Sequence, residues 1–121
     1  MATETIVLTR SVIEEYLNSK SHLTTELTKI YQCPSTVKAA SILLMHATNI
    51  DDLVDGSVTI AWSDYSDLDE MTYFISDGNL PARSGLNILH GKMFLEPMDA
   101  IWAKADALER IHLTMSILEI S

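Results

Sequence analysis

Two groups of carboxylates in this chain have a spacing that could support chemistry. Asp51, Asp52 and Asp55 form a DDxxD pattern. Carboxylates at this spacing can hold Mg²⁺, which usually bridges to substrate phosphates. The second group lies in residues 64–70, with the sequence DYSDLDE, and lacks the turn glycine of an EF-hand calcium loop. The two groups predict either a cation site or a strongly acidic surface.

The DDxxD string resembles the first aspartate-rich motif of trans-prenyltransferases and terpene synthases. The resemblance covers residues 40–55 and implies Mg²⁺ binding and prenyl chemistry at Asp51, Asp52 and Asp55. The chain has no second aspartate-rich motif and no pair of arginines just downstream. Its 121 residues are less than half the length that such a fold needs. A small Mg²⁺-dependent enzyme or ligand binder is therefore the least favoured alternative, and we expect no catalytic residue, no metal ligand and no cofactor.

The charge of the chain is concentrated in its middle. No Lys or Arg lies between Lys38 and Arg83, whereas eight Asp and Glu do, and the net charge is −9. Such a surface repels phosphate backbones and anionic membranes and attracts basic surfaces. We therefore expect a protein partner with a basic surface, and neither direct nucleic-acid binding nor membrane binding.

Aromatic residues accompany the carboxylates, and aromatic side chains dominate binding hot spots. We therefore predict a non-enzymatic protein-binding module, an inhibitor or decoy. It would dock on a basic surface that could normally hold nucleic acid, as phage anti-defence or toxin-immunity proteins do by analogy. The predicted partner-binding residues are Asp51, Asp52, Asp55, Trp62, Asp64, Tyr65, Asp67, Asp69 and Glu70.

Length and composition indicate a single domain over residues 1–121. Hydrophobic residues make up 47% of the chain and charged residues 21%, which is typical of a globular protein with its own core. Cys33 is the only cysteine, so no intrachain disulfide can form. Residues 1–10 show no basic region followed by an apolar run. We expect a cytoplasmic protein.

Apolar residues recur at helical spacing over most of the chain. Runs of β-branched and aromatic residues at 58–62 and 71–75 instead predict two strands of a hairpin, with a helix over 66–76 as the competing interpretation. The predicted helices cover 12–31 (one kinked helix, or two), 35–53, 81–90 and 97–118, and 6–8 is either a strand or a helix lead-in.

The expected fold class is therefore mainly α (α+β): a small domain of about four helices with one small β-hairpin in the middle. Two long helices of this kind could pack around a dimer axis. A self-assembling helical adaptor or structural protein is accordingly the other alternative.

Overall fold

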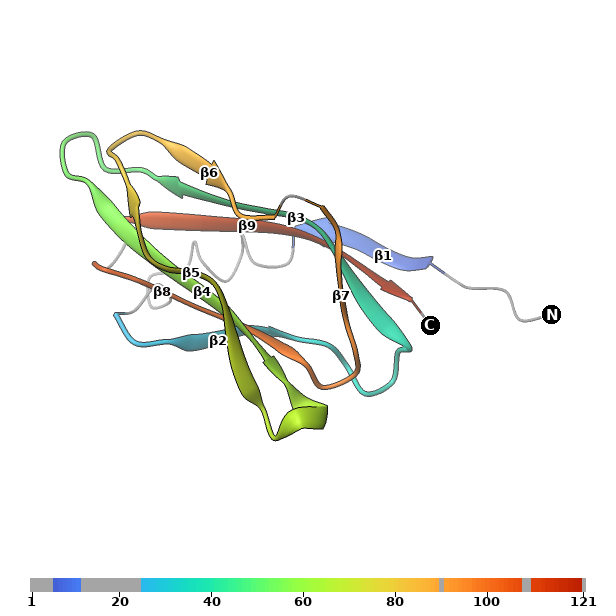
Figure 1. Cartoon of the computed structure of the whole chain (residues 1–121). Helices are drawn as coiled ribbons and strands as arrows, with labels where there is room; N and C mark the ends of the chain where they lie inside the picture. Colours follow the sequence, from blue (N-terminus) through green and yellow to red (C-terminus); the bar gives the residue numbers. More distant parts are fainter. Residues whose placement is uncertain (1–5, 12–24, 90, 108–109, 121) are drawn as a thin grey trace.

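The computed structural model describes residues 6–11, 25–89, 91–107 and 110–120. In these residues nine strands form two antiparallel sheets that face each other, with one short 3-10 turn, Tyr65–Asp67 (Figure 1). No helix in this part of the chain has the length and apolar character to cross a membrane. The strands are β1 (Ile6–Ser11), β2 (Thr28–Gln32), β3 (Ala39–Asn49), β4 (Gly56–Asp64), β5 (Glu70–Leu80), β6 (Gly85–Asn87), β7 (Met93–Leu95), β8 (Ala100–Ala105) and β9 (Ile111–Ile120).

Each sheet is assembled from strands that are distant in sequence. The first sheet has the order β1-β9-β3-β6, and β7 also pairs with β3. The second sheet has the order β2-β8-β4-β5. The chain changes sheet after β1, β2, β3, β5, β7 and β8, so the connecting loops gather at the two ends of the sandwich.

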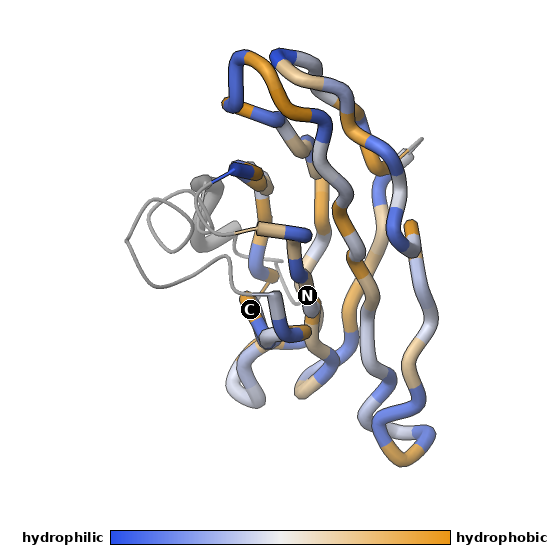
Figure 2. Tube along the Cα trace, turned by 90° about the vertical axis from the view of Figure 1, so that its left-hand side faces the viewer, coloured by the Kyte–Doolittle hydropathy of each residue, from blue (hydrophilic) through white to orange (hydrophobic). Residues whose placement is uncertain are grey.

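The core lies between the two sheets. Along β9, Ile111, Leu113, Met115 and Ile117 are buried and alternate with half-buried residues, as expected for a strand with one face on a core. The tube in Figure 2 shows the two layers and the change of hydropathy along their strands. The largest fully buried side chains of the other strands are Ile42, Met45, Val58, Ile60, Leu80, Leu95 and Ile101.

The prediction of a mainly helical domain is wrong. The segment 35–53 contains β3, whose apolar residues match a helical stripe only because the strand is irregular. Ala40 and Ile42 face the core, and a register shift between Ile42 and Leu44 moves the buried positions to Met45 and Ala47. A bulge of this kind breaks the two-residue period. The resulting spacing imitates that of a helix.

The other predicted helices are also replaced by strands. The segment 97–118 contains β8 and most of β9, and the segment 81–90 contains β6. Residues 28–32 form β2, residues 25–27 belong to neither a helix nor a strand, and residues 12–24 of the first predicted helix lie outside the described residues. Strands are present at 58–62 and 71–75, inside the longer β4 and β5, so the competing helix over 66–76 is excluded.

Candidate protein-binding site

The predicted partner-binding carboxylates lie at opposite ends of β4. Asp51, Asp52 and Asp55 precede the strand, in the loop of residues 50–55. Asp64 ends the strand and begins the hairpin tip, which we define as residues 64–70. A nine-residue strand spans about 26 Å, since each residue advances the chain by about 3.3 Å. The predicted partner-binding carboxylates therefore form two separate acidic groups.

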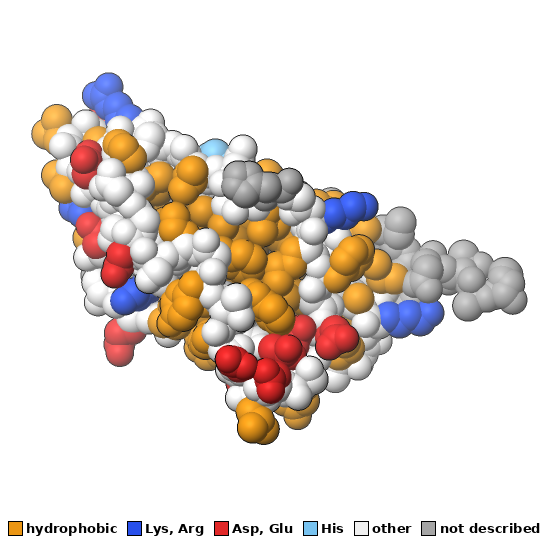
Figure 3. Space-filling model, in the orientation of Figure 1, with side chains coloured by type: hydrophobic (Ala, Val, Ile, Leu, Met, Phe, Trp, Pro, Cys, Tyr) orange, Lys and Arg blue, Asp and Glu red, His pale blue; other side chains and the backbone are white. Residues whose placement is uncertain are grey.

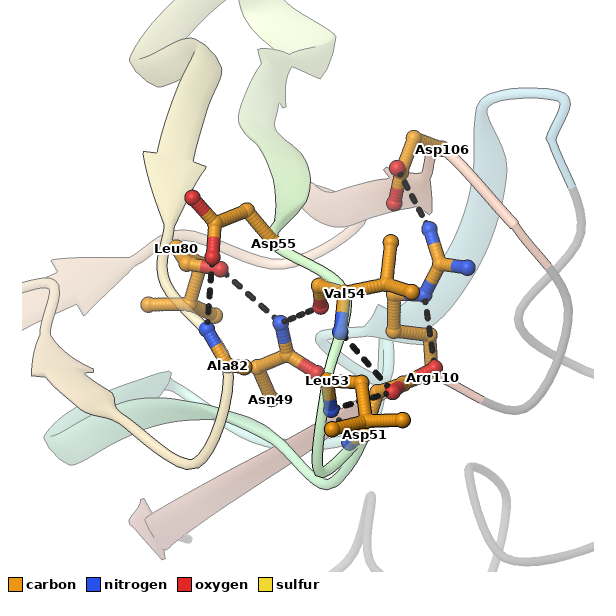
Figure 4. A network of polar contacts seen from close by, with 9 residues as sticks. All are labelled: Asn49, Asp51, Leu53, Val54, Asp55, Leu80, Ala82, Asp106 and Arg110. Atoms are coloured by element: carbon orange, nitrogen blue, oxygen red, sulfur yellow. Dashed lines mark hydrogen bonds and ion pairs between the residues drawn. The ribbon is translucent and has the colours of Figure 1, made fainter.

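In the 50–55 loop, Asp51 acts as a local acceptor. One of its carboxylate oxygens accepts hydrogen bonds from the backbone N–H groups of Leu53 (2.9 Å) and Val54 (3.0 Å). The other oxygen lies 3.5 Å from Nε of Arg110 (Figure 4). The backbone hydrogen bonds, and after them the Arg110 charge, lower the pKa of Asp51. This carboxylate is used to build the loop.

The other two aspartates of the DDxxD pattern are engaged in the same way. Oδ1 of Asp55 accepts a hydrogen bond from the backbone N–H of Ala82 at 3.1 Å. Oδ1 of Asp52 lies 3.3 Å from Nε of Arg83, and both side chains are exposed. Each aspartate thus has a separate partner. The arrangement holds the 50–55 loop against the turn that follows β5.

Asn49, which the sequence analysis did not single out, is the buried centre of this end of the molecule. Its side-chain amide donates hydrogen bonds to the carbonyl oxygens of Val54 (3.0 Å) and Leu80 (2.9 Å). Its Oδ1 accepts one from the backbone N–H of Asp51 at 2.9 Å. Residue 49 is fully buried. Asp51 and Asp55 of the DDxxD pattern are therefore part of a structural network (Figure 4).

The tip at the other end of β4 is a compact, defined turn. Oδ1 of Asp64 accepts hydrogen bonds from the backbone N–H (3.1 Å) and the hydroxyl (2.7 Å) of Ser66, and so caps the 3-10 turn. Leu68 and Asp69 both have φ of 59°, in the left-handed region. The backbone N–H of Asp69 then closes the turn on the carbonyl of Asp64 at 2.8 Å.

The tip presents apolar and acidic side chains together. Leu68 is 95% exposed and Tyr65 is 55% exposed. Asp67, Asp69 and Glu70 are also exposed, and among the described residues none of the tip carboxylates forms an ion pair. A hydrogen bond with Asp67, followed by the charges of Asp67 and Asp64, raises the pKa of Glu70. The tip therefore carries like charges that repel one another.

Two further acidic residues, Glu96 and Asp99, lie next to the tip. Asp99, which is 3% exposed, accepts hydrogen bonds from the backbone N–H groups of Tyr65 and Glu96. Figure 3 shows Asp and Glu side chains gathered at this end of the molecule, with hydrophobic side chains beside them. Sequence reasoning missed Asp99, because only the fold brings the β7–β8 turn to the hairpin.

One acidic group could hold a cation on grounds of proximity. Ligand atoms of Asp64, Glu96 and Asp99 lie within 4.8 Å of one another, and in the described part of the chain no other three such residues do so. Both oxygens of Asp99 and one of Asp64 already accept hydrogen bonds from the protein. We therefore assign the side chains of Asp64 and Asp99 to the support of the tip.

The predicted aromatic anchors separate as well. Tyr65 lies in the tip, whereas Trp62 is half-buried and packs against the core from β4. The tryptophan that lines a surface hollow with Tyr65 and Asp69 is instead Trp102 of β8, which is also half-buried. Its position was not evident from the sequence, because the pairing of β8 with β4 brings it there.

Comparison with known proteins adds no family assignment. No family model matches the chain, and no curated protein is significantly similar to it.

Proposed function

We propose that this chain is a non-enzymatic protein-binding module that docks through its tip on a basic surface of a partner protein. The observation that carries the proposal is the exposed tip itself. It combines a nearly fully exposed Leu68 with the carboxylates of Asp67, Asp69 and Glu70, which have no cationic partner among the described residues. After the hydrogen bond with Asp67, repulsion by the charges of Asp67 and Asp64 also raises the pKa of Glu70, and a basic partner would relieve this repulsion.

The acidic groups have different tasks in this proposal. The tip makes the contact, while the 50–55 loop contributes mainly to the long-range field of the net charge of −9. Charges arranged in this way accelerate association and make it sensitive to salt. Action as an inhibitor or decoy, on a cytoplasmic surface that normally holds nucleic acid, is the biological role that fits such a contact.

A defined cationic probe tests the proposal. Fluorescently labelled decalysine should bind at low salt, and its affinity should fall at least about tenfold at about 0.5 M NaCl. The double variant Asp67→Asn/Glu70→Gln should weaken binding more than the control Asp52→Asn/Glu26→Gln. The control also removes two negative charges, but from positions outside the tip. Equal weakening by the two double variants, or binding that is insensitive to salt, would contradict docking through the tip.

Self-association is a second candidate that a separate observation supports. Leu43 and Leu44 of β3 are each 43% exposed, and Phe94 of the adjoining β7 is 60% exposed. Adjacent exposed apolar side chains mark interaction surfaces more often than isolated ones do. The fold excludes the helical form of this alternative. The exposed side chains support instead a structural protein that assembles through this part of the first sheet.

Sedimentation distinguishes the second candidate. If the chain assembles through β3 and β7, Leu44→Ser/Phe94→Ser should shift it toward the monomer at micromolar concentration. Leu53→Ser is the matched control, because Leu53 is 87% exposed in the 50–55 loop. A wild-type chain that sediments as a monomer would remove this candidate.

A further inference from the structure

A hollow beside the tip has the features of a site for one side chain of the partner. It has a volume of about 390 Å³ and lies on the outer face of the second sheet. Trp102, Lys29 and Gln32 line it from the sheet, and Tyr65 and Asp69 line it from the tip. Its volume is near the lower end of the range for ligand pockets, about 300–1,000 Å³.

The orientation of Trp102 is fixed by the protein. Its indole Nε1–H donates a hydrogen bond to Oγ of Ser63 at 3.0 Å, and Ser63 is 2% exposed. Because Ser63 and Ala100 also line the hollow, small side chains leave space next to the indole. The hollow thus has a rigid aromatic wall.

The hollow already attracts a cation from the chain itself. Nζ of Lys29 lies 5.6 Å from the centroid of the Trp102 ring, within the range of a cation–π contact. The same ammonium donates a hydrogen bond to Oε1 of Gln32 at 3.3 Å. Lys29 is an exposed residue on a flexible stem, so it can leave the ring when a better cation arrives.

We propose that the hollow accepts an arginine side chain of the basic partner. The guanidinium would lie on the Trp102 ring, pair with the Asp69 carboxylate and replace Lys29 at Oε1 of Gln32. Arginine suits this place better than lysine, because a planar guanidinium stacks on an aromatic face while it donates several hydrogen bonds in its own plane. The inference rests on the proposed function and specifies the type of partner side chain that the module binds.

A titration with small probes tests the hollow apart from the tip. N-acetyl-arginine amide, N-acetyl-lysine amide and N-acetyl-citrulline amide are added to the ¹⁵N-labelled full chain at low salt. The readout is the indole N–H signal of Trp102, assigned with Trp102→Phe. The arginine probe should shift this signal saturably and bind about two- to fivefold more tightly than the lysine probe. The citrulline probe has the same shape without charge and should shift the signal least.

Two matched pairs of variants sharpen the test. Lys29→Met removes the competing cation and should tighten arginine binding about two- to fivefold beyond Lys104→Met, which removes one positive charge from the same sheet face. Asp69→Asn should weaken it more than Asp67→Asn, since Asp69 lines the hollow and Asp67 does not. Asparagine also tolerates the left-handed φ of position 69, so this variant should fold.

The outcomes separate the two proposals. Equal binding of the arginine and lysine probes, or equal effects within either pair of variants, would overturn the arginine site while decalysine could still bind the tip. If decalysine fails to bind but the arginine probe shifts the Trp102 signal, the arginine site in the hollow is supported and docking through the tip is contradicted. Stronger shifts with the citrulline probe would show that the hollow takes a neutral polar group instead.

Discussion

The buried carboxylate of Asp99 accepts a hydrogen bond of 3.0 Å from the backbone N–H of Tyr65. Its other oxygen accepts one of 2.9 Å from the backbone N–H of Glu96. Asp99 belongs to the connection between β7 and β8, whereas Tyr65 begins the turn after β4. A single side chain thus ties the tip to a loop that passes from one sheet to the other.

Replacement of Asp99 should therefore loosen the tip and destabilise the fold. Asp99→Ala leaves two backbone N–H groups without their acceptor, and we expect the free energy of unfolding in urea to fall by about 1–3 kcal/mol. Decalysine affinity should fall as well. Asp67→Ala is the control, an exposed change that should stay within about 0.5 kcal/mol of wild type. Equal stability of the two variants would show that Asp99 does not support the tip.

At the other end of β4, Asn49 should be the most sensitive polar residue. Asn49→Ala removes three hydrogen bonds and leaves the Leu80 carbonyl without its buried donor. The free energy of unfolding should fall by at least about 1–3 kcal/mol. Asn87→Ala should cost much less, because Asn87 is exposed and its Oδ1 makes a single side-chain hydrogen bond among the described residues, with Nδ1 of His46 at 2.7 Å. Denaturant unfolding of both variants checks the ranking.

The fold was only partly predictable from the sequence, for physical reasons that particular strands illustrate. The β-branched and aromatic residues of 58–62 and 71–75 give the hairpin directly. Strict alternation from Ile111 to Ile117 also indicated a strand, but it was included in a longer helical pattern. In β3, the bulge after Ile42 interrupts the alternation, which resumes in the other register at Met45.

The site was predictable in its composition and not in its layout. The carboxylates of the tip are adjacent in sequence, so their proximity follows from the chain itself. Their separation from Asp51, Asp52 and Asp55 depends on β4 being extended along its whole length. Asp99 and Trp102 join the tip only through strand pairing over a long sequence separation, which no local pattern encodes.

A side chain at position 78 of β5 should destabilise the fold while Ile75 is present. A Cβ at position 78 would collide with Cγ1 and Cδ1 of Ile75, which packs against the core. Gly78→Ala should lower the free energy of unfolding by about 1–3 kcal/mol. In an Ile75→Ala background the same change should cost less, so a double-mutant cycle should give a coupling energy of at least about 0.5 kcal/mol. Gly91→Ala, with no atom near the added Cβ, should be nearly neutral.

The stability contributed by Asp51 should depend on pH in the direction set by its lowered pKa. Hydrogen bonds from Leu53 and Val54 hold that pKa below the ordinary value of 3.8. The contribution of the carboxylate is therefore fully present above pH 3.8 and is lost as the pH falls through the folded-state pKa. Asp51→Asn should be less stable than wild type at neutral pH, and the difference should shrink in strong acid. A constant difference at every pH would assign the effect to shape instead of charge.

Glu70 should behave in the opposite sense, because its pKa in the folded chain lies above the ordinary value of 4.5. Folding disfavours its ionisation, so stability falls as the pH rises from 4.5 through the folded-state pKa and then stays lower. Glu70→Gln should raise the unfolding temperature at neutral pH and have little effect at about pH 4. Bound decalysine should lower the pKa of Glu70, measured from its ¹³C carboxyl shift. A pKa that stays raised in the presence of saturating decalysine would show that the cation binds away from the tip.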